Sequence, residues 1–239
     1  MCLILTKYKK LMEINVIMDK KTLYLFDIDG TLSNFLDFHA EAYQYAYKKV
    51  LGKTIPKEDF YRNFGIPGLI WNKKLFKEIG CDEKKIPEVY KEYRSYFFNL
   101  LDNSNVPLLE GVKEFLDFLK QNKQPLGIVT GNSEDKGVKI IETMKIKEYF
   151  QVFSYAVGEN PRSWIVEEAI SKAKDKNIGF DNVVVIGDTP MDVESGKQTG
   201  TLTVAVATGR FSRKQLIETN ADLVIDSMTE YMKIVELVQ

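Results

Sequence analysis

Two aspartates stand two positions apart directly after a short apolar run, in the segment Asp27-Ile28-Asp29-Gly30-Thr31. On an extended chain, side chains two positions apart point to the same side. The two carboxylates would therefore repel each other, and one would tend to take up a proton. A divalent cation resolves that conflict, and Gly30 allows the backbone to approach a ligand closely. An Asp-rich turn held by side-chain hydrogen bonds explains the same residues without any chemistry.

Two further polar segments also follow apolar runs. Val129-Thr130-Gly131-Asn132 combines a hydroxyl with backbone N–H groups at a helix start, an arrangement that can cradle an anion. The same residues are ordinary turn and N-cap sequence. Pro161-Arg162 brings a guanidinium that can neutralise two phosphate oxygens at once. A single arginine at a helix start is as readily explained by a side chain in water.

The last polar segment runs from Gly187 to Asp192 and contains two more carboxylates. Thr189 as N-cap, Pro190 at the first helical position and Asp192 near the third predict a helix start. That explains Asp192 without any function, but it leaves Asp188 unexplained. A few carboxylates completed by water and substrate phosphate are a ligand set that suits magnesium.

The elements that must position these residues are short apolar runs that alternate with amphipathic helical patterns. The runs lack polar alternation, as expected for parallel strands buried on both faces; they are Leu23–Phe26, Leu126–Val129, Val152–Ala156, Val183–Ile186, Leu202–Ala205 and Leu223–Ile225. We therefore expect an α/β protein with a Rossmann-like, doubly wound parallel sheet. In such sheets ligands bind at the carboxyl ends of the strands, where the polar segments lie.

One interval, residues 34–105, shows helical periodicity without a convincing buried strand. We interpret it as a helical cap inserted after the first strand, so that residues 19–33 and 106–239 form the core domain and residues 1–18 an N-terminal extension. A second helix near Tyr90–Leu101 is rich in aromatic residues, which we interpret as the core of the cap; they are Tyr90, Tyr93, Tyr96, Phe97 and Phe98.

Composition narrows the function. The chain has 239 residues, and its 33 Lys and Arg against 34 Asp and Glu give no electrostatic footprint for nucleic acid or an anionic membrane. Two cysteines are too few for a disulfide framework, and one histidine excludes a His-rich metal site. The apolar stretch Leu3–Leu5 is too short for a secretory core or a membrane span. We expect a cytoplasmic protein, a monomer or small homo-oligomer.

Taken together, the polar segments resemble those of the haloacid dehalogenase superfamily of aspartyl-phosphate hydrolases. The resemblance rests on Asp27-Ile28-Asp29-Gly30-Thr31 with the later Gly187-Asp188-x-x-x-Asp192, and it covers roughly residues 20–33 and 106–230. The inserted helices match the α-helical cap of the family. The resemblance implies a Mg2+-dependent phosphatase that acts on a small phosphorylated metabolite. Phosphoglycolate-phosphatase-like members are the most similar, from the cap position and from the Thr130-Gly131-Asn132 and Pro161-Arg162 segments.

The resemblance also assigns roles. Asp27 matches the nucleophile, which becomes a transient acyl phosphate, and Asp29 matches the general acid that protonates the leaving alcohol and then activates water. Magnesium would be held by Asp27, the backbone carbonyl of Asp29 and Asp188, with Asp192 assisting directly or through a water. Thr130 matches the hydroxyl that holds a phosphoryl oxygen. The remaining phosphate-binding positions are Gly30, Thr31, Gly131 and Asn132.

Two parts of the pattern depart from the family or lie open. Most relatives carry lysine at the third motif, usually just before a proline, whereas here Arg162 follows Pro161, and we assign Arg162 to that role. The cap would govern the substrate, and its candidates are His39, Arg62, Asn63, Gly65 and Ile66. His39 is equally well explained as a packed core residue, and Arg62 as a side chain in water.

Three rival functions share parts of this pattern. Haloacid dehalogenases use the same nucleophile on carbon but lack the second aspartate, so Asp29 favours phosphorus. A phosphomutase of the β-phosphoglucomutase type shares the four motifs and the cap, although its second motif is usually Ser-rich. A non-catalytic binding protein on the same fold is the third alternative, because a fold alone does not establish function.

Overall fold

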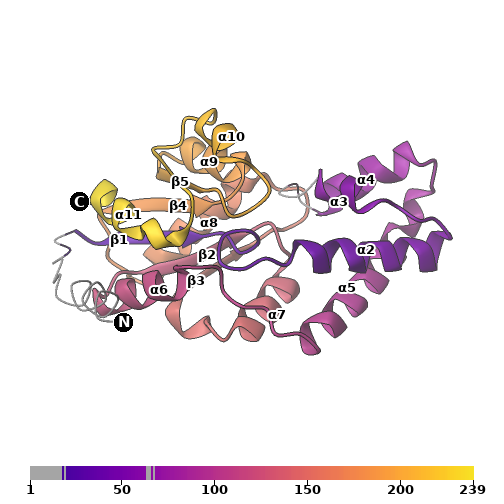
Figure 1. Ribbon diagram of the computed structural model, residues 1–239, viewed down its shortest axis with the longest axis horizontal. Coiled ribbons are helices and arrows are strands. Elements are labelled where there is room, and N and C mark those ends of the chain that lie inside the picture. Colours follow the sequence, from indigo (N-terminus) through magenta and orange to yellow (C-terminus); the bar gives the residue numbers. More distant parts are fainter. Residues whose placement is uncertain (1–17, 19, 63–65, 67) are drawn as a thin grey trace, which may run out of the picture.

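The computed structural model describes residues 18, 20–62, 66 and 68–239, so all but one residue of the expected N-terminal extension lies outside the described residues. All six expected strands are present and form one parallel sheet in the order β3-β2-β1-β4-β5-β6 (Figure 1). Their bounds are β1 (Thr22–Phe26), β2 (Leu126–Thr130), β3 (Val152–Tyr155), β4 (Asn182–Gly187), β5 (Leu202–Val206) and β6 (Leu223–Ile225).

Successive side chains of each strand point to opposite faces of the sheet. Both faces therefore carry apolar side chains, and helices cover both. Tyr24 and Phe26 of β1 pack into one hydrophobic cluster with Phe115, whereas Leu23 and Leu25 belong to a second cluster. The first cluster includes residues of α6 (Val112–Gln121), α7 (Glu134–Met144) and α11 (Tyr231–Val238), and the second residues of α8 (Arg162–Asp175). α9 (Pro190–Gln198) and α10 (Arg213–Ile217) complete the α/β, Rossmann-like fold.

Among the described residues, four α-helices lie beyond the carboxyl edge of the sheet, at the right of Figure 1. They are α2 (Leu36–Leu51), α3 (Lys57–Tyr61), α4 (Gly68–Glu78) and α5 (Ile86–Asp102). Aromatic side chains form their core, where the Tyr43 ring stacks on Tyr93 at a centroid distance of 3.8 Å and on Phe60 at 5.5 Å. The described part of residues 34–105 contains no strand, in agreement with the helical periodicity of the sequence.

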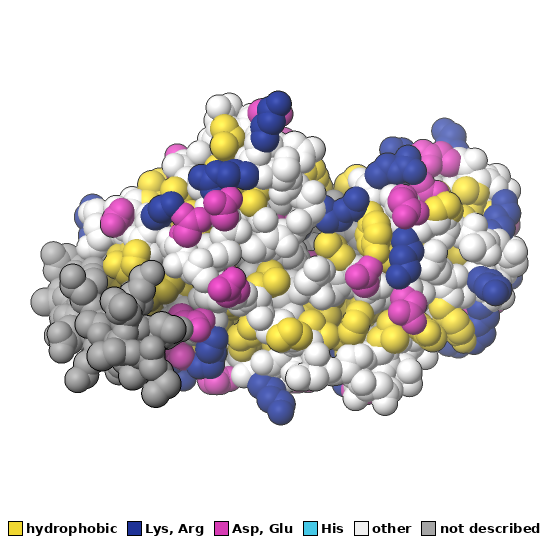
Figure 2. Space-filling view, in the orientation of Figure 1, with side chains coloured by type: hydrophobic (Ala, Val, Ile, Leu, Met, Phe, Trp, Pro, Cys, Tyr) yellow, Lys and Arg dark blue, Asp and Glu magenta, His cyan; other side chains and the backbone are white. Residues whose placement is uncertain are grey.

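The helical unit meets the rest of the chain along α5 and α7. Tyr90 Oη lies 2.8 Å from Ser133 Oγ, and Arg94 forms an ion pair with Asp135. Lys139 pairs in the same way with Asp102. Figure 2 shows a notch in the upper outline of the molecule between the sheet with its helices and the helical unit. Among the helices of the described residues, none is long and apolar enough to cross a membrane.

Candidate active site

The polar segments of the sequence meet because β2, β1 and β4 are neighbours in the sheet. Asp27 follows β1 and donates its backbone N–H to the Ile186 carbonyl oxygen of β4 at 2.9 Å. A cavity of about 320 Å³ opens at this edge and extends to the helical unit. Its lining includes most of the candidate site residues; they are Asp27, Asp29, His39, Arg62, Thr130, Gly131, Asn132, Arg162 and Asp188. Gly30, Thr31 and Asp192 do not line the cavity.

Three buried carboxylates form the centre of the site. Oxygens of Asp27, Asp188 and Asp192 lie within 4.8 Å of one another. Burial and the neighbouring carboxylates raise the pKa of Asp27 to about 7, against the opposing effect of Arg162. Burial and the same neighbours raise the pKa of Asp188 well above its usual range. Hard oxygen ligands that repel one another in a small volume fit a divalent cation such as Mg2+.

Arg162 bridges two of these carboxylates. It is the first residue of α8, after Pro161 as N-cap. Its Nη2 lies 2.8 Å from Asp27 Oδ1, and its Nε donates to Asp192 Oδ1 at 2.9 Å. The absence of a side chain at Gly131 leaves room for the guanidinium, because a Cβ there would lie 3.0 Å from Arg162 Nη1. The arginine of the third motif therefore lies against the candidate nucleophile.

Asp192 links that arginine to the start of α9. Its Oδ2 accepts hydrogen bonds from the backbone N–H of Thr189 at 3.0 Å and from Thr189 Oγ1 at 2.6 Å. Thr189 is the N-cap and Pro190 the first helical residue, as the sequence predicts. Both carboxylate oxygens of Asp192 thus already accept hydrogen bonds from protein groups. Asp27 and Asp188 are therefore the better placed cation ligands.

Two glycines make room for Asp188. A Cβ on Gly30 would lie 2.4 Å from Asp188 Oδ2, and a Cβ on Gly209 would lie 1.7 Å from the same atom. Thr31 Oγ1 donates to Asp188 Oδ1 at 3.4 Å. Gly30 and Thr31, expected among the phosphate-binding residues, thus contact this carboxylate and do not line the cavity.

The loop after β5 is part of the site and was missed in the sequence. Thr208 Oγ1 donates to the Gly30 carbonyl oxygen at 2.6 Å, and Gly209 lies against Asp188. Arg210 and Phe211 line the cavity, and the Arg210 guanidinium lies 4.5 Å from the centroid of the Tyr61 ring in α3. The one feature of the sequence that could have indicated this loop is its position, because it follows a predicted strand, β5, that ends at the same sheet edge as β1, β2 and β4.

Asp29 is held from two sides. Asn132 Nδ2 donates to Asp29 Oδ2 at 2.6 Å and also to Thr130 Oγ1 at 3.2 Å, so this amide orients the candidate acid. His39 Nε2 lies 3.4 Å from Asp29 Oδ1. Burial opposes ionisation of Asp29, but His39, Asn132 and Lys136 more than offset it and lower the pKa of this carboxyl.

His39 connects Asp29 to the helical unit. The side chain is buried in α2, its Nδ1 lies 2.6 Å from Tyr93 Oη, and its ring stacks on Phe97 at 4.3 Å. Burial lowers the pKa of His39, against the opposing effect of Asp29. A neutral ring that accepts from Tyr93 can donate its Nε2 proton toward Asp29. His39 is thus both packed and in contact with the site.

Two residues near Asp29 were not recognised from the sequence. Tyr93 was interpreted as cap core only, and it does pack there, but it also lines the cavity. Lys136 lies in the first turn of α7, is 6% exposed and lines the cavity as well. The one signal for Lys136 was a cation near a helix N-terminus, where the helix dipole disfavours it.

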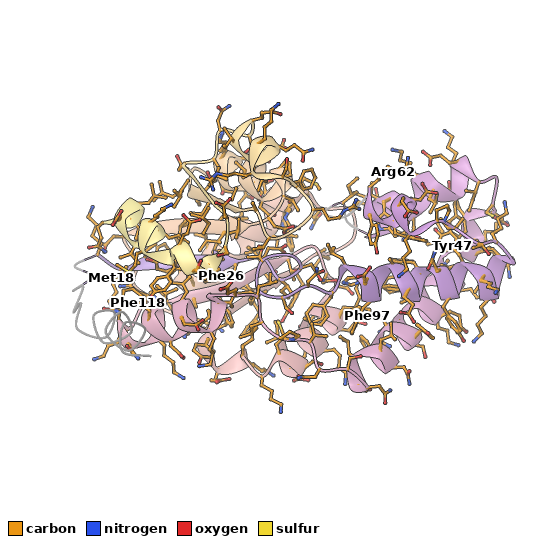
Figure 3. All side chains as sticks on the ribbon, in the orientation of Figure 1. Met18, Phe26, Tyr47, Arg62, Phe97 and Phe118 are labelled. Atoms are coloured by element: carbon orange, nitrogen blue, oxygen red, sulfur yellow. The ribbon has the colours of Figure 1, made fainter. Side chains whose placement is uncertain are left out.

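The other cap candidates lie at the mouth of the cavity. Arg62 follows α3 (Figure 3); its side chain is 73% exposed and pairs with Asp59 at 2.5 Å. Ile66 lines the cavity, and Asn63 and Gly65 lie outside the described residues. Arg62 is therefore mostly in water in this structure, although it borders the cavity.

The sequence pattern of the haloacid dehalogenase-like hydrolases matches residues 24–206. The chain belongs to this family. The matched range contains the three clustered carboxylates and Arg162, and it ends just before the Thr208–Phe211 loop.

Family members of known name are similar along almost the whole chain. The pyrophosphatase PpaX of Listeria welshimeri is 28% identical over 221 residues, which cover 90% of this chain and 97% of that protein. The pyrophosphatase PpaX of Bacillus cereus is 25% identical over 213 residues, which cover 88% and 94%. The similarity to these enzymes supports the activity of a phosphatase-type hydrolase for this chain.

Several solved structures share the fold. A haloacid dehalogenase-like hydrolase from Streptococcus pneumoniae matches with a TM-score of 0.73 at 20% identity, over 90% of this chain and 98% of that one. CbbY from Rhodobacter sphaeroides, in complex with xylulose-(1,5)bisphosphate, matches with a TM-score of 0.74 at 18% identity, over 87% and 95%. A β-phosphoglucomutase-like protein from Bacteroides vulgatus matches at 0.73 and 24% identity, over 98% and 94%.

Proposed function

We propose that this chain is a magnesium-dependent phosphatase that hydrolyses a small phosphorylated metabolite through an aspartyl phosphate on Asp27. The observation that carries the proposal is the buried cluster of Asp27, Asp188 and Asp192 with Arg162 bonded to Asp27, beside a second carboxylate, Asp29. One carboxylate suited to attack and one suited to proton transfer, both lining one cavity, are what a two-step phosphoryl transfer needs.

The carboxylate cluster also supports the metal. Asp27 and Asp188 would hold the magnesium ion, together with the backbone carbonyl of Asp29. When bound, the ion would neutralise the charge of the phosphoryl oxygens and of the clustered carboxylates. With that charge balanced, Asp27 stays ionised at neutral pH even though burial raises its pKa to about 7.

The chain's own residues supply the remaining chemistry. An Asp27 oxygen attacks phosphorus while the bond to the leaving oxygen breaks. Asp29, which is ionised in the free protein, accepts a proton that the phosphate monoanion of the substrate brings into the site and passes it to the leaving oxygen. Arg162 and the Thr130 hydroxyl stabilise the oxygens of the transferred group. In the second step Asp29 takes a proton from water, the water oxygen bonds to phosphorus, and Asp27 is released with inorganic phosphate. His39 and Asn132 hold Asp29 in place for both steps.

We propose that residues 34–105 act as a cap domain on a core of residues 19–33 and 106–239. The cavity supports this division, because its wall combines sheet-edge residues with side chains of α2, α3 and α5. A cap over the carboxylates suits a small substrate and would exclude water from the first step.

Three more specific functions fit this site. The sequence motifs favour a phosphoglycolate-phosphatase-like phosphomonoesterase, whereas the names of the relatives favour pyrophosphate as the substrate. A phosphomutase of the β-phosphoglucomutase type is the alternative, and the likeness to a protein of that type is one of fold. Phosphate release separates hydrolysis from isomerisation of a sugar phosphate.

The test is phosphate release from a panel of phosphomonoesters and pyrophosphate, with magnesium and with EDTA. The panel includes the activated ester p-nitrophenyl phosphate. We expect magnesium-dependent turnover of at least one member of the panel. A purified, folded protein without magnesium-dependent release from any member would contradict the proposal.

Asp27→Asn tests the nucleophile. Removing its charge should reduce turnover by a factor of at least about 10³, while the thermal transition stays cooperative. Residual turnover within tenfold of the wild type would show that another group attacks phosphorus.

A further inference from the structure

Lys136 is a buried cation that the steps above do not use. It lies in the first turn of α7, where the helix dipole opposes a positive charge. Its side chain is 6% exposed and lines the cavity. Burial of a lysine at this place costs free energy twice, through desolvation and through the dipole. The position therefore calls for a function that compensates for the cost.

The surroundings of Lys136 are aromatic. Its Nζ lies 5.6 Å from the ring centroid of Tyr90 and 5.1 Å from that of Tyr93. Its hydrogen bond to Tyr93 Oη is long, at 3.4 Å. An ammonium group has three N–H donors, and in the described part of the chain this is its one side-chain hydrogen-bond partner. Donors therefore remain for a group in the cavity.

Comparable cations nearby have carboxylate partners. Arg162 contacts Asp27 and Asp192, Arg94 pairs with Asp135, and Lys139, one turn further along α7, pairs with Asp102. For Lys136 the described residues place no carboxylate oxygen within 4.0 Å. The charges of Asp29 and Asp135 act on it from a greater distance. A cation that is buried without a counter-ion would be stabilised by an anion entering the cavity.

The contacts also indicate which part of a substrate such an anion belongs to. Lys136 bonds to Tyr93, Tyr93 to His39, and His39 lies 3.4 Å from Asp29. Lys136 is thus on the Asp29 side of the cavity, whereas Arg162 contacts the nucleophile Asp27. If Asp29 protonates the leaving oxygen, the leaving group lies on the Lys136 side.

We propose that Lys136 binds a second anionic group, a carboxylate or a phosphate, on the leaving group of the substrate. The inference rests on the proposed function and deepens it: the site selects small phosphate esters or anhydrides whose leaving group is itself negatively charged. The cavity of about 320 Å³ has room for such a small, doubly anionic molecule.

Matched substrates test the selection. Within each pair the leaving group differs in charge: 2-phosphoglycolate against ethylene glycol monophosphate, and pyrophosphate against methyl phosphate. We expect a kcat/KM at least about tenfold higher for the charged member of one pair or both, and the preferred pair distinguishes a carboxylate from a phosphate. A wild-type enzyme that hydrolyses p-nitrophenyl phosphate with magnesium but shows no such preference would overturn this inference alone. No turnover of any substrate would overturn the proposed function, and the inference with it.

Variants test the residue. Lys136→Met removes the charge at similar length, and we expect it to raise KM for the preferred charged substrate roughly 10- to 100-fold, the range for one hydrogen bond to a charged group. The loss of kcat/KM on p-nitrophenyl phosphate, whose leaving group has no second anion, should be at least about tenfold smaller than the loss on the charged substrate. Lys136→Arg, which retains the charge, should recover part of the loss. Lys139→Met is the matched control, because it removes a paired lysine from the same helix.

Thermal unfolding distinguishes binding from a structural role. We expect the Tm of Lys136→Met to equal or exceed that of the wild type, because an unpaired buried charge is replaced by an apolar side chain. A lower Tm with an equal loss of kcat/KM on charged and uncharged substrates would overturn the proposal. Such a result would show that Lys136 serves to hold α5 against α7.

Discussion

Arg162 and Asp27 form the contact on which the chemistry depends most directly. Its Nη2 contacts both Asp27 and Asp192, and its Nε also donates to Asp192, so one edge of the guanidinium joins the proposed nucleophile to the start of α9. A lysine offers a point charge and cannot hold both carboxylates in the same planar geometry. In the proposed role of the family's lysine, Arg162 would therefore also order the start of α9.

Substitutions at Arg162 should separate its charge from its geometry. We expect Arg162→Ala to lower kcat/KM by a factor of about 10² to 10³, the range for loss of one preorganised electrostatic contact. Arg162→Lys should retain more activity than Arg162→Ala, because the charge beside Asp27 remains. Steady-state kinetics on one substrate measure both. The control is Arg213→Ala, since Arg213 is an exposed residue of α10 that pairs with Asp226. Near-normal kinetics of Arg162→Ala would contradict the assignment.

At the scale of elements, the loop after β5 shapes the proposed metal site through its backbone. Gly209 lies so close to Asp188 that even a methyl group would displace the carboxylate. Gly209→Ala should therefore raise the magnesium concentration at half-maximal activity by about tenfold or more, in the range seen when the support of a metal ligand is lost. Magnesium titrations followed by activity and by calorimetry measure the change.

Gly179 provides the matched control for that substitution. A Cβ on Gly179 would meet no atom within 4 Å, so Gly179→Ala should leave magnesium dependence and stability near those of the wild type. If Gly209→Ala bound magnesium as the wild type does, Asp188 would not be the ligand that the geometry favours.

The elements that the sequence predicted are those whose signal is local. Six runs of buried, branched residues matched six strands, and Thr189-Pro190 matched the start of α9. The site residues that were missed depend on tertiary contacts. Gly209 matters because β5 brings it against Asp188, and Lys136 matters because α5 covers it with Tyr90 and Tyr93. No periodicity or spacing within a segment reports such contacts.

At the scale of the whole molecule, the cavity exists because the helical unit rests on the sheet edge. The α5–α7 contact, with Tyr90 on Ser133 and Arg94 on Asp135, holds the unit there. That same contact buries Lys136. Its charge state is therefore a property of the folded arrangement as a whole, since the unfolded chain would leave the lysine in water.

The groups around Lys136 keep a constant charge while the lysine titrates. Burial raises the pKa of Tyr90 and of Tyr93, so both stay neutral, and burial lowers the pKa of His39, which is neutral as well. The two facing carboxyls have lowered pKa values and stay ionised; they are Asp29 and Asp135. Burial lowers the pKa of Lys136 from 10.5 to about 8, against the effect of these carboxylates.

Stability should therefore depend on pH in a defined window. Between pH 8 and 10.5 the unfolded chain binds a proton at Lys136 that the folded chain does not, so the free energy of unfolding rises with pH. Below pH 8 Lys136 is charged in both states, so the full free-energy cost of burying that charge is present in the folded wild type. Lys136→Met removes it, so the variant's advantage over the wild type should be largest below pH 8, on the order of 3 kcal/mol at about 1.4 kcal/mol per pKa unit.

Urea unfolding of the wild type and Lys136→Met, in EDTA at pH 7 to 10, measures this difference. We expect the gap between the two free energies of unfolding to narrow steadily as the pH rises, because the wild-type lysine loses its proton in the folded state. Lys139→Met should show no such trend, since its partner Asp102 is an exposed surface carboxylate and such pairs contribute little. A gap that stays constant from pH 7 to 10 would mean that Lys136 titrates as it does in water, with its ammonium group hydrated in the folded protein.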